Sequence, residues 1–343
     1  MNPNPNYAFE QRLEGLREEA RQKGRVTGKG VLAAGGPMLA PARGLPEIES
    51  RAPGYFGLPV LKPHVWQWMI PVYFFIGGLA GMSALIALGG MIAGSHDLIR
   101  VAIWIAAAGA IVSPILLAAD LGRPMRFLNM LRVLKPQSPM SVGSWILTAF
   151  VVAVVPAAIL TEFYYHGTTG GSGDAALQIA ANILIAVSAL IGIFLSTHTG
   201  VLISATAVPA WFSHRALLPM HFGVIGLGSA ASLLVLIGFN RSPLIAVGIA
   251  TALVETAAAL WLLVRRHGAV DRALHRGRSG LVLQLSELLT GPIALALWLT
   301  NIRIAAALCF LAGSILSRFG WLDAGRASAC DPESLFASQR PQA

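Results

Sequence analysis

The sequence has few charged residues for its length. Asp, Glu, Lys and Arg make up 12% of the 343 residues, whereas hydrophobic residues make up 55% and the mean hydropathy is +0.66. A soluble globular fold would have too few polar side chains to cover this much apolar surface. The composition therefore predicts an all-α, polytopic membrane protein whose main partner is the lipid bilayer and not a nucleic acid.

Cysteine is also scarce, with only Cys309 and Cys330. An iron–sulfur cluster or a structural zinc site needs about four ligands, so we expect no metal site and no cluster in this chain. A bis-histidine haem needs two inward-facing histidines at matching depth, and only His198 and His221 come close to that arrangement. Both lie near the ends of predicted helices, so no haem is expected. Any redox chemistry must use the metal centres of a partner.

Apolar segments long enough to cross a bilayer, roughly twenty residues each, occur eight times. The predicted spans are 66–93, 98–119, 141–164, 175–204, 216–239, 243–264, 279–298 and 302–320. Pro71 to Gly90 and Pro219 to Gly238 share matching residues at seven of twenty positions, which suggests two repeated halves. We therefore expect two four-helix bundles, at 65–205 and 206–322, between an N-terminal extension at 1–64 that contacts partner subunits and a tail at 323–343.

Basic residues are distributed unevenly between the two ends of these spans. All but three of the 25 Lys and Arg residues fall on the side that carries both termini, the exceptions being Arg100, Arg241 and Arg303. Because Lys and Arg are retained on the cytoplasmic side, both termini and the loop after Asp120 are predicted to be cytoplasmic.

Polar residues from the first four spans are predicted to meet at this basic side. A quinone head group needs hydrogen-bond donors, a proton carrier and apolar walls. The residues predicted to supply them are His64, Gln67, Tyr73, Asp120, Arg123, Ser144, Trp145 and His198. Simpler roles stay open: Asp120 could only form an ion pair with Arg123 or Arg126, His64 could be solvated, and His198 could bond to a neighbouring helix. The cations Arg126, Arg132 and Lys135 of the same loop are predicted to dock a partner.

Two acids lie deeper in the predicted membrane spans, Glu255 and Glu287. Ionisable groups at such depth are costly and therefore candidates for function. With Asp120 and His221 they could form a proton path. Its exit could be marked by four residues nearer the opposite face, Glu162, Asn182, Asn301 and Arg303. The alternative is that each acid is protonated or paired for structural reasons, for instance with His221.

Four segments resemble the NrfD/PsrC family of membrane subunits: IPVYFFIGGLAG from Ile70, DLGRPMRFLNMLRVLKPQSPMSVGSW from Asp120, TGVLISATAVPAW from Thr199 and RFGWLDAGRASACDP from Arg318. The resemblance covers roughly Pro59 to Pro332. It implies two four-helix bundles without haem in a bacterial inner membrane, and a site for menaquinone or ubiquinone in the first bundle.

The resemblance also implies a ferredoxin-like iron–sulfur subunit that connects the chain to a catalytic subunit of molybdopterin or hydrogenase type. The N-terminal segment GYFGLPVLKPHVWQW is similar to forms found in formate-dehydrogenase-like complexes. By itself the chain is expected to catalyse no reaction. The competing function is a haem-free transporter or proton-conducting module, suggested by the repeated halves and the two deep acids.

Overall fold

A computed structural model describes Leu61 and residues 66–120, 129–166, 172–264, 268 and 270–339. Within these ranges the chain is helical and contains no strand. The predicted site residues His64, Arg123 and Arg126 lie outside the described residues. The helices are α3 (Met69–Ile92), α4 (His96–Asp120), α6 (Pro139–His166), α7 (Ser172–Ser204), α8 (Pro209–Ser213), α9 (Leu217–Leu236), α10 (Ser242–Val264), α11 (Arg272–His275), α12 (Gly277–Thr290), α13 (Pro292–Leu299), α14 (Arg303–Cys330) and α15 (Pro332–Gln339).

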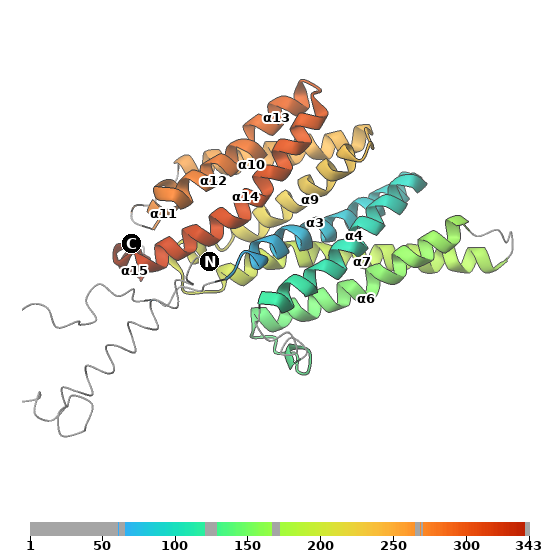
Figure 1. Cartoon of the computed structure of the whole chain (residues 1–343), viewed down its shortest axis with the longest axis horizontal. Helices are drawn as coiled ribbons and strands as arrows, with labels where there is room; N and C mark the ends of the chain where they lie inside the picture. The colour runs from blue at the N-terminus through green and yellow to red at the C-terminus, as the bar shows by residue number, and fades with distance from the viewer. Residues whose placement is uncertain are drawn as a thin grey trace, which may run out of the picture. The chain divides into compact units, whose positions relative to one another are not determined.

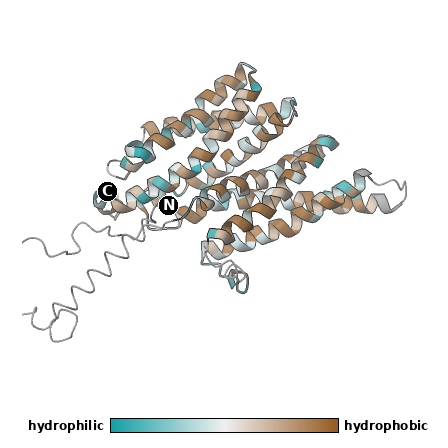
Figure 2. Cartoon of the chain, in the orientation of Figure 1, coloured by the Kyte–Doolittle hydropathy of each residue, from teal (hydrophilic) through white to brown (hydrophobic). Residues whose placement is uncertain are grey.

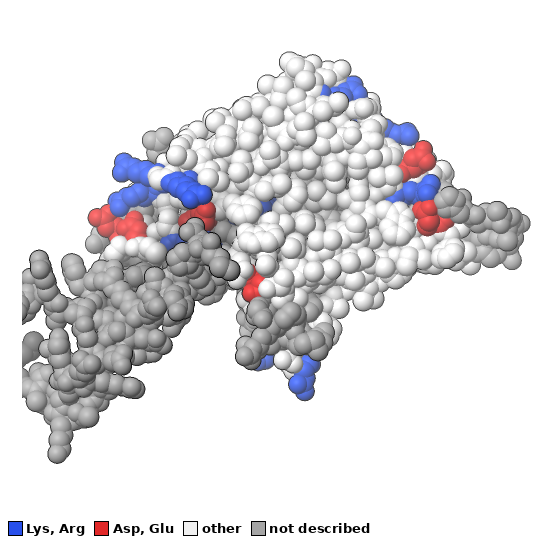
Figure 3. Space-filling view, viewed as in Figure 1, with Lys and Arg blue, Asp and Glu red and all other residues white. Residues whose placement is uncertain are grey.

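The eight predicted spans are confirmed: eight helical segments of the described residues are long and apolar enough to cross a membrane. Hydrophobic residues predominate along the helices, and hydrophilic residues gather towards their ends (Figure 2). In the space-filling view, charged side chains likewise lie at the two ends, with a wide uncharged band between them (Figure 3). The chain is therefore a multi-pass membrane protein.

The seventh span is a broken helix, α12 followed by α13. The break falls at Gly291, whose backbone is not helical, and Pro292 occupies the first turn of α13. Proline suits this position because it has no N–H to leave unsatisfied there. The break lies one turn after Glu287, whose backbone carbonyl accepts a hydrogen bond from the Gly291 N–H at 2.9 Å.

The eighth span is longer than predicted. We expected it to end at residue 320 and counted Arg318 with the basic loop residues, but α14 continues to Cys330 and Arg318 is only 1% exposed. The count of cations on the basic side was therefore wrong for this residue. Average hydropathy falls at an arginine, so a prediction from hydropathy ends the span there. The helix itself continues because Trp321, Ala324 and Ser328 also face the interior.

The spans form two groups of four, α3, α4, α6 and α7, and α9, α10, α12–α13 and α14 (Figure 1). The two groups meet where α9 packs against α3 and α7, and where α14 packs against α3. There Gly78 and Gly226, which correspond in the two sequence repeats, lie against each other: a Cβ on Gly226 would be 3.0 Å from the Gly78 carbonyl oxygen. The residue boundaries expected for the four domains stay predictions.

Close contact between α3 and α7 fixes the first bundle. A Cβ added to Gly81 would lie 2.3 Å from the carbonyl oxygen of Gly192, and the reverse distance is the same. Lipid chains are as apolar as the helix surfaces, so small residues that allow close backbone packing are a main source of helix association in membranes. This crossing sets the positions of Tyr73 on α3 and His198 on α7 relative to each other.

Candidate functional site

A pocket of about 130 Å³ opens among the four helices of the first bundle, where α4 ends and α6 begins. Four residues predicted for the quinone site line it: Tyr73, Asp120, Ser144 and His198. The sequence analysis did not predict the other lining residues, Trp66, Ile70, Phe74, Leu117, Met130, Met140, Gly143 and Leu202. Most of these are apolar, so the pocket combines a few polar groups with hydrophobic walls.

His198 lines this pocket and has one ring nitrogen without a hydrogen-bond partner in the described part of the chain. The side chain is buried, and its Nε2 atom has no hydrogen-bond partner among the described residues. The ring bonds to the backbone carbonyl of Pro139, which leaves Nδ1 as the atom that donates to it. In a neutral ring, a proton on Nδ1 leaves the lone pair on Nε2.

Gly143 makes room for the His198 ring. A Cβ at this position would lie 2.6 Å from Cε1 and 2.9 Å from Nδ1 of His198, much closer than ordinary van der Waals contact. Pro139 and Gly143 are one helical turn apart on α6, so one turn both accepts the hydrogen bond and accommodates the ring. The need for a glycine here was not visible in the sequence.

Asp120 ends α4 at the edge of the pocket. Its Oδ1 accepts a hydrogen bond from the backbone N–H of Gln67 at 3.1 Å, so Gln67 takes part through its backbone while its side chain is exposed. The described cation that interacts electrostatically with Asp120 is Arg326 of α14. We had expected Arg123 or Arg126 in this role, and those residues lie outside the described part of the chain.

The second half of the chain also supports a wall of the pocket. Arg326 donates to the backbone carbonyl of Trp66, and the Trp66 ring stacks on Trp211 with 5.6 Å between centroids. Trp211 in turn donates from Nε1 to the Trp321 carbonyl at 2.7 Å and packs against the backbone of Gly325. The sequence feature that could have indicated this wall is the pair of tryptophans near the start of the first span. Nothing in the sequence indicated that Trp211 would pack there.

The remaining predicted residues lie outside the pocket lining. Trp145 is 38% exposed and does not line the cavity, whereas its neighbour Ser144 does. The Ser144 hydroxyl donates to the Ser141 carbonyl at 2.8 Å, which leaves its oxygen available as an acceptor. Arg132 and Lys135 are exposed on the loop before α6, at the same end of the bundle.

A second polar cluster lies in the other bundle. His221 Nδ1 is 2.9 Å from Glu255 Oε2, and His221 Nε2 is 2.9 Å from the Ser317 hydroxyl. Glu287 is close enough to interact electrostatically with both His221 and Glu255. The structure thus brings these three predicted residues together and adds Arg318, whose charge interacts with Glu255. Asp120 belongs to the first pocket and not to this cluster.

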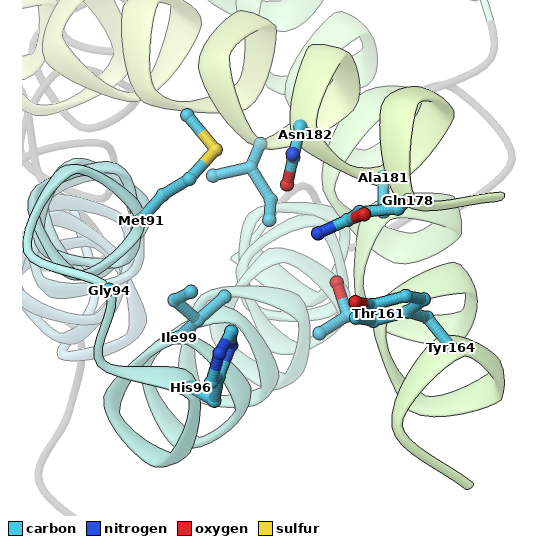
Figure 4. Close-up of a pocket in the computed structure, with 10 residues that line it drawn as sticks. Met91, Gly94, His96, Ile99, Thr161, Tyr164, Gln178, Ala181 and Asn182 are labelled. Carbon is cyan, nitrogen blue, oxygen red and sulfur yellow. The ribbon is translucent and has the colours of Figure 1, made fainter. Parts of the chain in front are cut away.

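The first bundle has another pocket at its opposite end, of about 120 Å³ (Figure 4). Gln178 and Asn182 point into it from α7, Thr161 and Tyr164 from α6, and His96 from the start of α4. Asn182 was expected to mark a proton exit. Glu162, given the same role, instead forms an ion pair with Arg100 at 2.6 Å and does not line the pocket.

The chain matches a known protein family. The family described as "Polysulphide reductase, NrfD" matches residues 60–243, which is more than half of the chain. The match includes every residue that lines the pocket beside His198, and ends before Glu255, Glu287 and Arg318. No curated protein matches the chain significantly.

Proposed function

Because the chain belongs to the NrfD polysulphide reductase family, we propose that it is the quinone-reactive membrane anchor of an oxidoreductase complex. The observation that carries this proposal is the pocket of the first bundle, whose apolar walls are lined by Asp120, Tyr73, Ser144 and a buried His198 with an Nε2 that is unpartnered among the described residues. A quinone ring requires such walls, and its two oxygen atoms require groups that exchange protons and hydrogen bonds.

His198 acts as the inner proton carrier. With Nδ1–H bonded to Pro139, the Nε2 lone pair accepts a proton from a quinol hydroxyl, and the doubly protonated ring donates one to a quinone carbonyl. Ser144 and Tyr73 lie on the same cavity as further hydrogen-bonding groups. Each reduction of a quinone takes two electrons and two protons, and the reverse reaction returns them.

Asp120 acts as the outer proton carrier. It is only partly buried and stands at the end of α4, so it can exchange protons with water as well as with the pocket. Burial favours its neutral form, whereas the hydrogen bond from the Gln67 N–H and the charge of Arg326 favour its charged form. His64 and Arg123, predicted for this site, stay predictions because they lie outside the described residues.

The electrons are proposed to come from, or go to, the clusters of a ferredoxin-like iron–sulfur subunit. That subunit connects the anchor to a catalytic subunit of molybdopterin or hydrogenase type. Arg132 and Lys135 are exposed beside the pocket, where they can contact such a partner. We propose that this face and both termini are cytoplasmic, in a bacterial inner membrane. Co-purification followed by metal analysis identifies the partners directly.

The test uses the intact complex and two acceptors. In the His198→Gln and Asp120→Asn variants we expect quinone-linked turnover to fall, about 10²-fold or more for His198→Gln if it carries the proton. Turnover with a water-soluble acceptor that takes electrons from the catalytic partner should stay normal. Trp145→Phe is the matched control, because Trp145 follows the lining residue Ser144 but lies outside the cavity. Unaltered quinone turnover of both site variants in assembled complexes would rule the site out.

A proton-conducting module is the second candidate, favoured by the buried His221–Glu255 pair beside Glu287. Reconstituted vesicles containing the complex test it by measuring proton transfer during quinone turnover. We expect transfer to fall in Glu255→Gln and Glu287→Gln, while the rate of electron transfer to quinone changes less. If proton transfer per electron is the same as in the unmodified complex, this function is excluded.

A further inference from the structure

Arg318 is a fully buried cation inside the membrane-spanning part of the protein. Its guanidinium carbon lies 3.7 Å above the centre of the Phe222 ring, and Nη2 donates to the Phe222 carbonyl at 3.0 Å. Nε and Nη1 have no hydrogen-bond partner among the described residues. A single hydrogen bond and a ring face are insufficient to compensate a buried guanidinium, so its charge must be balanced by a nearby anion.

The groups that face Arg318 identify this anion. Glu255 of α10 interacts with it electrostatically, and the Oε1 atom of Glu255 also has no partner among the described residues. A Cβ at Gly78 of α3 would lie 3.5 Å from Arg318 Nη2 and 3.3 Å from the Ser196 hydroxyl of α7, and neither Gly78 nor Ser196 carries a charge. Unused donors on Arg318 and an unused acceptor on Glu255 therefore belong to the same buried cluster.

Four ionisable side chains make up this cluster, which we call the α9–α14 cluster: His221 on α9, Glu255 on α10, Glu287 on α12 and Arg318 on α14. Towards the basic end of α14, Asp323 and Arg326 form a separate, partly exposed ion pair at 3.4 Å. Net charge in a medium of low polarity is expensive, so a cluster of this kind is most stable when its charges sum to zero.

We propose that Arg318 sets the number of exchangeable protons in the α9–α14 cluster to one. With Arg318 positive and both acids ionised, the cluster would carry one net negative charge. One proton, shared among Glu255, Glu287 and His221, makes it neutral. Without the arginine charge, neutrality requires two protons, which would occupy two of the same three groups.

A cluster with one proton and three acceptors can pass that proton between positions. Glu287 lies one turn before the break at Gly291, and discontinuous membrane helices commonly line sites for ions. The carbonyl end of α12 favours positive charge there. This consequence rests on the proposed proton-conducting function, whereas the proton count itself does not.

Variants that change the cluster charge by one unit test the proposal. Infrared spectra of the intact complex report protonated Glu255 and Glu287 through the carboxyl C=O band that shifts in D₂O, with Glu→Gln variants for assignment. Nitrogen NMR reports the charge of His221. Arg318→Gln should hold one more proton than the wild type, and Arg318→Lys, which keeps the charge, should hold the same number. Arg318→Gln combined with Glu287→Gln should return to one.

The outcome is decisive even if Arg318→Gln does not assemble, because Arg318→Lys and the double variant keep the cluster neutral. Equal proton counts in wild type and Arg318→Gln would overturn the proposal, as would a double variant with no proton or two. If the counts agree with expectation but vesicles show no dependence on Glu255 or Glu287, proton conduction fails while the role of Arg318 stands.

Discussion

Replacing Gly143 with alanine is the most direct test of how His198 is held in the pocket. The added methyl would stand 2.6 Å from His198 Cε1, about 0.8 Å inside the 3.4 Å at which ordinary contacts begin. The imidazole must therefore move away from α6. Since Pro139 is one turn earlier on the same helix, this movement also lengthens the hydrogen bond from Nδ1.

Overpacking of this kind costs about 1–3 kcal/mol. If quinone binding depends on the position of Nε2, most of this cost appears as weaker binding of quinone. In the protein without quinone, the displaced His198 ring can relax into the cavity. One to three kcal/mol corresponds to a rise of about 5-fold to 150-fold in the Kd or KM for quinone, since about 1.4 kcal/mol equals a factor of ten.

The assay compares KM for a short-chain quinone with turnover of a water-soluble acceptor in the same purified complex. Gly89→Ala is the matched control, because it adds the same methyl to an exposed membrane-helix glycine with nothing within 4 Å of the new atom. We expect Gly89→Ala to leave both activities unchanged. If Gly143→Ala has the same KM as this control, the reasoning that places quinone against His198 is refuted.

Two further predictions concern stability. Gly81→Ala places a methyl 2.3 Å from the Gly192 carbonyl oxygen, and the backbone there cannot move aside. The free energy of unfolding should therefore fall by about 3 kcal/mol, which would be measured as a lower Tm in detergent. A Tm equal to that of Gly89→Ala would contradict this prediction. Arg272 is exposed and pairs with Glu333 at 2.6 Å, so Arg272→Ala should leave Tm unchanged. The hydrogen bond with Glu333 raises the already high pKa of Arg272, so the arginine stays charged and this result should hold across neutral pH; a clear drop in Tm would show that the pair matters.

The sequence predicted part of the candidate site because helix ends can be followed across a membrane. Asp120, Ser144 and His198 lie at the ends or starts of spans on one side, so counting spans is enough to place them at one depth. Tyr73 followed because it lies near the start of its span. The same count could not say that Trp145 would point away from the cavity, since the rotation of a helix is set by its neighbours.

Arg318 shows where reasoning from hydropathy fails. A window average treats an arginine as the end of a span, and so it was counted with the cytoplasmic cations. The structure buries it because α14 is packed on the α3–α9 contact, where the Phe222 ring and carbonyl and the charge of Glu255 receive it. Its place depends on residues about 60 and 100 positions away along the chain.

The sequence alone determined that the chain crosses a membrane eight times, with both deep acids in the second half, because each span depends only on the composition of about twenty consecutive residues. The tertiary structure decided which side chains meet. It placed Arg326 beside Asp120, Trp211 on Trp66, and Arg318 beside Glu255. These contacts depend on how far each helix is rotated and how closely small residues let it approach, and neither is encoded in a local stretch of sequence.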